Sequence, residues 1–233
     1  MPLRSAPLPR MAGHLSFMRA QTKAIRDVKS GDLAVLGVPF EDTSAPYAGQ
    51  SLAPRALRET SVYFGWHANP QFSHPVDIEA RQEISTDGLH ERLCDLGDIS
   101  LGSDGEIHEA LQTATSQISS QGACAIILGG SDRLAKTVQR ALPDFQTAQL
   151  GGRSGDGDDF CIAPLVGKSA TSQQANVAAQ LAAFAQWRDE TRPLFVRFDL
   201  SVFETPLSVL CDRPRLGGCD LDTVAQWLSA LGQ

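Results

Sequence analysis

The chain alternates short apolar runs with stretches of helical periodicity. The apolar runs are short enough to be buried strands, and glycine or proline ends several of them. We therefore expect strands at 32–38, 92–99, 123–128, 145–150, 161–166 and 194–200. Helices are expected at 54–60, 107–119, 132–140, 173–187 and 220–231. This alternation predicts an α/β fold in which a central parallel sheet lies between two layers of helices, a three-layer α/β/α arrangement.

Residue types typical of helix starts support these helices. Pro54 occupies a plausible first helical position. Ser103 or Asp104 can cap the helix at 107–119, and Ser131 or Asp132 can cap the next one. In the helix at 107–119 the apolar residues recur on one face, as an amphipathic helix requires: Ile107, Leu111, Ala114 and Ile118.

The pattern contains no internal repeat and no linker, so we expect one α/β domain at 31–233 after an N-terminal arm at 1–30. The arm is basic: its first 26 residues contain five Lys or Arg residues and no acidic residue. It lacks the continuous apolar core of a secretion signal. We favour an arm that packs on a partner subunit, and a disordered end and an organelle transit peptide stay open as alternatives.

Composition and charge narrow the classes of function. Twenty Lys and Arg residues against 27 Asp and Glu residues give a net charge of −7, whereas general nucleic-acid binding needs a basic surface. No apolar run is long enough to span a membrane. Five cysteines without C-x-x-C spacing indicate neither a disulfide framework nor a zinc site. Three of them, Cys94, Cys124 and Cys161, are expected to act as small apolar residues, and we expect a cytoplasmic protein.

The loops that follow the predicted strands are the expected location of any chemistry. In an open parallel sheet, ligands bind at the carboxyl ends of the strands. Three such loops span 129–132, 151–159 and 199–204. The pair Gly129-Gly130 lacks the rest of a phosphate-binding glycine motif. No Ser or Cys nucleophile with a histidine partner is evident, and the five histidines show no metal-ligand spacing.

These loops and two N-terminal segments together resemble the ureohydrolase family of arginases and agmatinases. The sequence DLAVLGVPF at 32–40 is similar to the family's first strand and its Gly-Val-Pro-Phe turn, and YAGQSLAPRALR at 47–58 is similar to the segment that follows. DLGDI at 95–99 matches another recurrent element. The resemblance covers most of 30–231. It implies an arginase-like fold, hydrolysis of guanidino groups and a two-metal centre that usually holds manganese.

The chain departs from the family pattern at the metal motifs. At 129–133 it reads Gly-Gly-Ser-Asp-Arg where the family has Gly-Gly-Asp-His-Ser, so Asp132 replaces a histidine ligand. Of the six ligand positions that the resemblance implies, only Asp199 keeps the family's residue. Asp132 and Asp199 are therefore the residual ligand-position candidates. The remaining four positions have lost their ligands: Gly151, Arg153, Gly155 and Ser201.

This residue set does not favour a two-metal centre. Two divalent cations about 3.5–4 Å apart need several bridging carboxylates to offset their repulsion, and a guanidinium at Arg153 adds positive charge. We expect no bound metal and no catalytic residue in this chain, and Arg153 becomes a candidate anion-binding residue. A shifted alignment would let Asp156, Asp158 and Asp159 hold one hard cation, although we favour a solvated turn.

Retained scaffold motifs beside replaced ligands favour a catalytically inactive ureohydrolase-like subunit. The resemblance implies a trimer or hexamer with an active paralogue, which would hold manganese or nickel and act on a guanidino or biguanide compound. Metformin hydrolase is one heteromer of this kind. The resemblance also implies that the family's closing strand has no counterpart after Ser201. We expect a partner subunit to cover the open strand edge.

Two alternative functions stay open. One is a divergent hydrolase with a site rebuilt from Asp132, Asp199, Glu204 and the acidic residues at 156–159. The other is a metal-free sensor in which Arg153 and the glycine-rich loop bind a small anion.

An aromatic cluster lies outside all of these motifs. Tyr63, Phe64 and Trp66 follow the predicted helix at 54–60. They fit either core packing, which we favour, or an interface anchor, because aromatic residues dominate both environments.

Overall fold

The computed structural model describes residues 15–44, 48–63, 76–77, 81–83, 88–100, 102–129, 131–151, 159–162, 170–203 and 218–231. Its contacts divide the chain into two compact units. Unit 1 comprises Met1–Thr43 and Ala48–Ala141, and unit 2 comprises Ser44–Tyr47 and Leu142–Gln233. A single domain at 31–233 stays a prediction.

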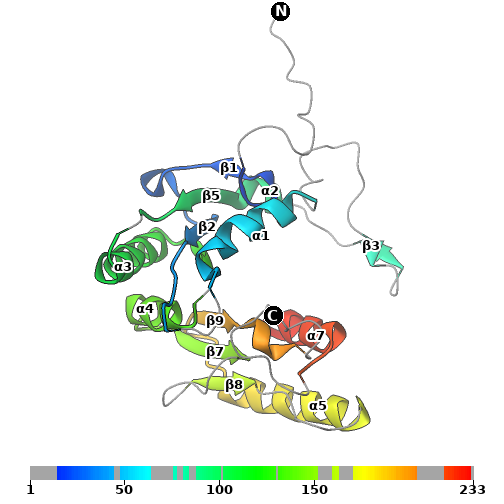
Figure 1. Ribbon diagram of the computed structural model, residues 1–233. Coiled ribbons are helices and arrows are strands. Elements are labelled where there is room, and N and C mark those ends of the chain that lie inside the picture. Colours follow the sequence, from blue (N-terminus) through cyan, green and yellow to red (C-terminus); the bar gives the residue numbers. More distant parts are fainter. Residues whose placement is uncertain are drawn as a thin grey trace, which may run out of the picture. The chain divides into compact units, whose positions relative to one another are not determined.

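Unit 1 contains a four-stranded parallel sheet (Figure 1). Its strands are β1 (Gln21–Thr22), β2 (Leu33–Val38), β5 (Leu93–Asp98) and β6 (Cys124–Gly129), and their order is β1-β5-β2-β6. Strand β2 is central and pairs in parallel with both β5 and β6. A separate antiparallel pair joins β3 (Val76–Asp77) to β4 (Gln82–Glu83).

Helices cover both faces of this sheet because its side chains alternate between two apolar clusters. On one face Val35, Leu93 and Leu128 form a cluster with Ala20 from the N-terminal segment. On the other face Ala34 and Cys94 pack with Ile118 of α3. Residues at i and i+1 of a strand point to opposite faces, which explains the two clusters. The helices in the described part of unit 1 are α1 (Ala53–Ser61), α2 (Leu89–Arg92), α3 (Asp104–Ser120) and α4 (Arg133–Ala141).

Helix α3 begins at Asp104, three residues before the predicted range of 107–119, and Ser103, one of the two predicted caps, is its N-cap. The Ser103 hydroxyl accepts a hydrogen bond from the Glu106 backbone N–H, and the Glu106 carboxylate accepts one from the Ser103 backbone N–H at 2.7 Å. This reciprocal capping box satisfies two backbone N–H groups at the start of the helix.

Among the described residues of unit 1, short 3-10 turns lie at Phe17–Arg19, Ile25–Asp27 and Gln50–Leu52. The first of them ties the N-terminal segment to the sheet and to α1. The Phe17 backbone N–H donates to the Asp95 carboxylate at 2.7 Å, and the Met18 N–H donates to the Ser61 hydroxyl at 2.8 Å. Residues 15–20 of the predicted arm therefore contact the α/β core.

Unit 2 contains a three-stranded parallel sheet of β7 (Gln146–Leu150), β8 (Phe160–Ile162) and β9 (Leu194–Phe198), in the order β8-β7-β9. Helices α5 (Ala170–Trp187) and α7 (Leu221–Leu231) contribute to its core. Trp227 of α7 is 1% exposed and shares a cluster with Leu150 and Ile162 of the sheet and with Phe184 of α5. This apolar cluster holds the strands of unit 2 against its helices.

The predicted element order is confirmed wherever the structure describes the chain. Each predicted helix is present, and the strand predicted at 161–166 is described only over Phe160–Ile162. The sequence did not predict β1, β3 or β4, each of which has two residues. No helix among the described residues combines the length and the apolar content that crossing a bilayer requires.

The expectation for two cysteines is wrong. Cys94 is buried, but Cys124 and Cys161 are exposed. Cys161 lies between the half-buried Phe160 and the buried Ile162 on β8, which pairs with β7 alone among the described strands. Alternation along this edge strand points Ile162 to the core and Cys161 away from it.

Candidate functional site

The ends of β7 and β9 bring two of the six ligand positions side by side. The strands are parallel, with Leu150 opposite Phe198. The backbone N–H of Asp199 donates to the Leu150 carbonyl at 2.9 Å, so Asp199 lies next to the start of the loop at Gly151. The prediction that these two loops meet at one edge of a parallel sheet is therefore confirmed.

Gly151 has no room for a ligand side chain. Its φ angle is +74°, a left-handed conformation that disfavours any residue with a Cβ. A Cβ built there would lie 2.7 Å from the Val202 nitrogen, 2.8 Å from the Asp199 carbonyl oxygen and 2.9 Å from the Val202 Cβ. Two of these atoms belong to the backbone. An aspartate at position 151 would therefore require the turn after β9 to move.

The retained carboxylate, Asp199, has a structural task. It is the N-cap of the 3-10 turn Leu200–Val202, and its Oδ1 accepts a hydrogen bond from the Ser201 backbone N–H at 2.8 Å. Ser201 itself is 3% exposed, and its hydroxyl carries no charge to offset a cation. Of the two ligand positions at the end of β9, one caps a turn and the other lacks a carboxylate.

A polar pair, one member buried and the other half-buried, lies two residues before Gly151 and Asp199 on the two strands. Gln149 on β7 is opposite Arg197 on β9 and is 1% exposed. The Arg197 Nη1 donates to the Gln149 Oε1 at 3.1 Å, and the Gln149 Nε2 donates to the Gly151 carbonyl at 2.5 Å. These bonds link the two strand ends through side chains as well as through the backbone.

Arg197 places a positive charge near the retained carboxylate. Burial lowers the pKa of this guanidinium from its ordinary value, and the charge of Asp199 opposes that shift. The group is half-buried, so its charge is less screened than on an open surface. A divalent cation at Asp199 would be repelled by this guanidinium.

Sequence reasoning missed both members of this pair. The signal was present only for Arg197, the one charged residue in the otherwise apolar strand LFVRF, because the strand QTAQL that holds Gln149 also contains Gln146 and Thr147. Gln149 and Arg197 each stand two residues before a ligand position, Gly151 or Asp199, so each projects from the same face of its strand as that position.

The other predicted positions lie in unit 1 or outside the described residues. Asp132 belongs to unit 1, whereas Asp199 belongs to unit 2. Arg153 and Gly155 lie outside the described residues, as do Asp156, Asp158 and Glu204. Among the described residues there is no group of three or more His, Cys, Asp or Glu side chains that could hold a metal. The described residues at the ends of β7 and β9 do not fit a two-metal centre.

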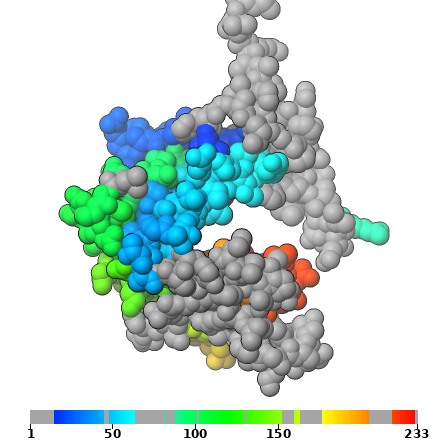
Figure 2. Space-filling model, in the orientation of Figure 1, coloured from blue at the N-terminus to red at the C-terminus, as the bar shows by residue number. Residues whose placement is uncertain are grey.

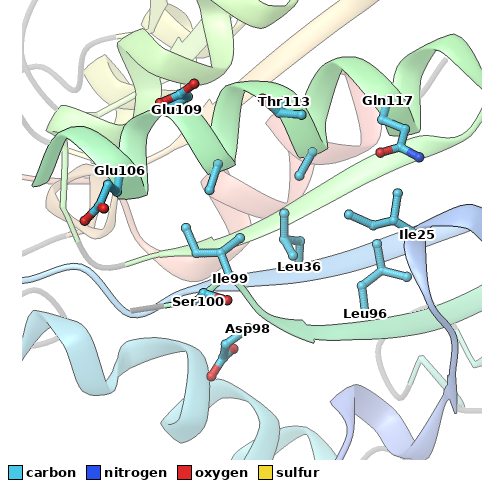
Figure 3. Close-up of a pocket in the computed structure, with 12 residues that line it drawn as sticks. Ile25, Leu36, Leu96, Asp98, Ile99, Ser100, Glu106, Glu109, Thr113 and Gln117 are labelled. Carbon is cyan, nitrogen blue, oxygen red and sulfur yellow. The ribbon is translucent and has the colours of Figure 1, made fainter. Parts of the chain in front are cut away.

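A groove of about 490 Å³ lies along α3 in unit 1 (Figure 3). Leu36, Leu96 and Ile99 line it with aliphatic side chains from β2, β5 and the residue after β5. Figure 3 shows Glu106 and Gln117 of α3 near opposite ends of this surface. None of the described ligand positions is among its lining residues, so it is separate from the candidate site.

Comparison with known proteins identifies the family. The model of the arginase family matches residues 31–151, just over half of the 233 residues. The chain therefore belongs to the arginase family, and the predicted resemblance is confirmed.

Solved structures confirm the fold class. A hypothetical agmatinase from Burkholderia thailandensis has a TM-score of 0.71 at 18% identity, over 96% of this chain and 80% of that chain. Proclavaminate amidino hydrolase from Streptomyces clavuligerus has a TM-score of 0.73 at 17% identity, over 97% and 86%. Formimidoylglutamase from Bacillus subtilis has a TM-score of 0.63 at 16% identity, over 97% and 83%. At these identities the comparison shows an arginase-like α/β fold.

Proposed function

We propose that this chain is a catalytically inactive subunit that assembles with an active, metal-dependent paralogue of the arginase family. The observation that carries the proposal is Gly151. This ligand position has no side chain, and the backbone of Val202 and Asp199 occupies the space that a Cβ would need. A hydrolytic site rebuilt at the ends of β7 and β9 would have to displace that contact first.

The charges around Asp199 support the same proposal. Hydrolysis by two metal ions needs carboxylates that bridge the ions and a bound water of lowered pKa. Here the Asp199 carboxylate caps a turn, and the Arg197 guanidinium supplies a positive charge nearby. Both features favour a structural role for the end of β9 over a role in metal binding.

The partner and its chemistry follow from the family. We propose a trimer or hexamer in which the active paralogue holds manganese or nickel and hydrolyses a guanidino or biguanide compound, in the manner of metformin hydrolase. The names of two structural neighbours, an agmatinase and an amidino hydrolase, favour a substrate of this class. The function of this chain would be to complete the assembly in the cytoplasm.

Co-expression with the arginase-family protein encoded nearest to it in the genome tests the proposal. We expect the two chains to co-purify, and we expect metal analysis to find manganese or nickel in the complex but not in this chain alone. Hydrolysis of guanidino compounds should require both chains. The control is a paralogue variant with one metal ligand replaced, which should co-purify and be inactive.

A variant of this chain separates the proposal from its main rival. Asp199→Asn keeps an oxygen that can cap the turn but removes the charge that a metal ligand needs. Under the proposal the complex keeps its activity with this variant. Near-stoichiometric metal and turnover in the isolated wild-type chain, abolished by Asp199→Asn, would establish a divergent hydrolase instead. A paralogue that is fully active alone would remove the accessory role.

A further inference from the structure

The exposed apolar side chains of unit 1 gather around one helix. Among its described residues, four large apolar side chains are exposed: Leu15 (37%), Leu52 (64%), Leu57 (44%) and Tyr63 (55%). Three of them lie on α1 or directly beside its ends. Leu15 precedes the N-terminal turn that packs against α1. We call the surface formed by Leu52, Ala56 and Tyr63 the α1 face.

Helical geometry separates the α1 face from the buried side of the helix. Pro54, Arg58 and Ser61 are buried toward the sheet. At about 100° per residue, the exposed Leu52, Ala56 and Tyr63 fall on the opposite side. Figure 2 shows α1 in cyan at the molecular surface. Clustered exposed apolar residues typically mark a site of interaction.

The exposure of Tyr63 tests the prediction that the aromatic cluster packs in the core. For Tyr63 that prediction is wrong, because its side chain is 55% exposed. Phe64 and Trp66 lie outside the described residues.

The charges beside this face are self-complementary. Arg55 and Glu59 are both exposed on one flank of the apolar stripe, and the Arg55 Nε lies 2.8 Å from the Glu59 Oε1. The two opposite charges are four residues apart and centred on position 57. A second α1 helix, placed antiparallel about a two-fold axis through this centre, would bring its Glu59 to Arg55 and its Arg55 to Glu59. The small side chain of Ala56 would let the two helices approach closely.

We propose that the α1 face binds the α1 face of a second copy of this chain in an antiparallel, two-fold symmetric contact. Such an isologous contact needs a surface that matches itself, and the Arg55–Glu59 flank provides that match. The buried Arg58 already fixes α1 to β5 before association. Binding would therefore cost little conformational entropy. This self-association is independent of the proposed inactivity and of the active paralogue.

Sedimentation equilibrium of the full chain, up to about 100 μM, tests the proposal. We expect a reversible dimer. Ala56→Glu places a bulky charge at the centre of the contact and should weaken the dimer at least about tenfold. The matched control is Thr113→Glu on α3, which is also an exposed helical position and should leave dimerisation unchanged. Circular dichroism, and Tm measured at a concentration at which the wild type is monomeric, should be unchanged in both variants and would show that folding is intact.

Charge reversal tests the pairing itself. Arg55→Glu and Glu59→Arg should each weaken the dimer by about tenfold. In each single variant, residues 55 and 59 carry the same charge, so two pairs of like charges face each other across the two-fold axis. The double variant should restore the dimer to within about threefold of the wild type. A wild-type chain that stays monomeric at about 100 μM, or a double variant as weak as the singles, would overturn the proposal. A third result would also overturn it: Ala56→Glu still dimerises but no longer co-purifies with the paralogue. The α1 face would then bind the paralogue and not a second copy of this chain.

Discussion

Gly151 shows at the scale of one residue how a ligand position becomes part of the scaffold. Its positive φ and the absence of a Cβ let the loop after β7 lie directly against the turn after β9. Asp199 then caps that turn instead of facing an ion. Restoring a ligand side chain at position 151 would therefore destabilise the fold, whatever affinity for a metal it contributed.

Gly151→Ala should destabilise the protein by about 2–4 kcal/mol. About 1–2 kcal/mol comes from the left-handed conformation, and the remainder comes from the overlap with Val202 and Asp199. The measurement is urea denaturation at neutral pH. Gly31→Ala is the matched control, since Gly31 has a φ of +83° but no atom within 4 Å of the added Cβ. It should lose only about 1–2 kcal/mol, and equal losses in both variants would contradict the close approach at Gly151.

At the scale of an element, α1 depends on one buried arginine. The Arg58 Nε and Nη2 donate to the two oxygens of Asp95 at 2.8 and 2.9 Å, and its Nη1 donates to Asp98 at 2.5 Å. The Arg58 and Asp95 side chains are only 6% and 2% exposed. Bidentate pairing of this kind fixes the direction of the helix relative to β5.

Arg58→Met should lower the free energy of unfolding by about 3–5 kcal/mol, because it leaves the Asp95 carboxylate buried without its cation. Chemical denaturation at low protein concentration measures the loss. Arg55→Met on the same helix is the control, since the Arg55–Glu59 pair is largely exposed and surface pairs contribute little. Similar losses in the two variants would show that the buried pair does not hold α1.

The same pair gives the protein an acid-sensitive contact. Burial alone would raise the pKa of Asp95, but hydrogen bonds from Arg58 and from the Phe17 and Gly97 backbone hold it below its ordinary value of 3.8. A carboxyl whose folded-state pKa is depressed stabilises the fold above its unfolded pKa, and this contribution is lost as the pH falls through the folded-state value.

Asp95→Asn should accordingly be less stable than the wild type at pH 7 and should lose less stability on acidification. Tm measured from pH 6 down to about pH 2 tests this expectation. Parallel pH profiles for the two proteins would mean that Asp95 does not contribute to the acid dependence.

At the scale of the whole molecule, the fold should not depend on a bound metal. A ligand that binds only the native state raises the unfolding free energy in proportion to the logarithm of its concentration. We expect EDTA or added manganese or nickel to change the Tm of the isolated chain by less than about 1 °C. A rise of several degrees with one of these metals, reversed by EDTA, would point to a rebuilt site.

The order of the elements was readable from the sequence because its signals are local. Periodicity of two or 3.6 residues, Ser103 before α3, and Asp220 before α7 each act over a few residues. Asp220 does cap α7, where its Oδ1 accepts a hydrogen bond from the Thr223 N–H at 2.8 Å. The strands β1, β3 and β4 gave no such signal, since two residues are too few to show a period.

The candidate site was only partly readable in this way. The sequence located the strand-end loops and the replaced ligands, because motifs keep their order along the chain. It did not reveal that Gln149 and Arg197 pair across the strands, or that Tyr63 is exposed. Both facts depend on which residues pack together in space.

The sequence by itself determined the fold class, the family and the loss of most metal ligands, since each is a matter of residue type and order. Only the tertiary structure decided whether a ligand could return to position 151. The atoms that would obstruct it belong to Asp199 and Val202, which are about 50 residues away along the chain and adjacent only because β7 and β9 pair in parallel.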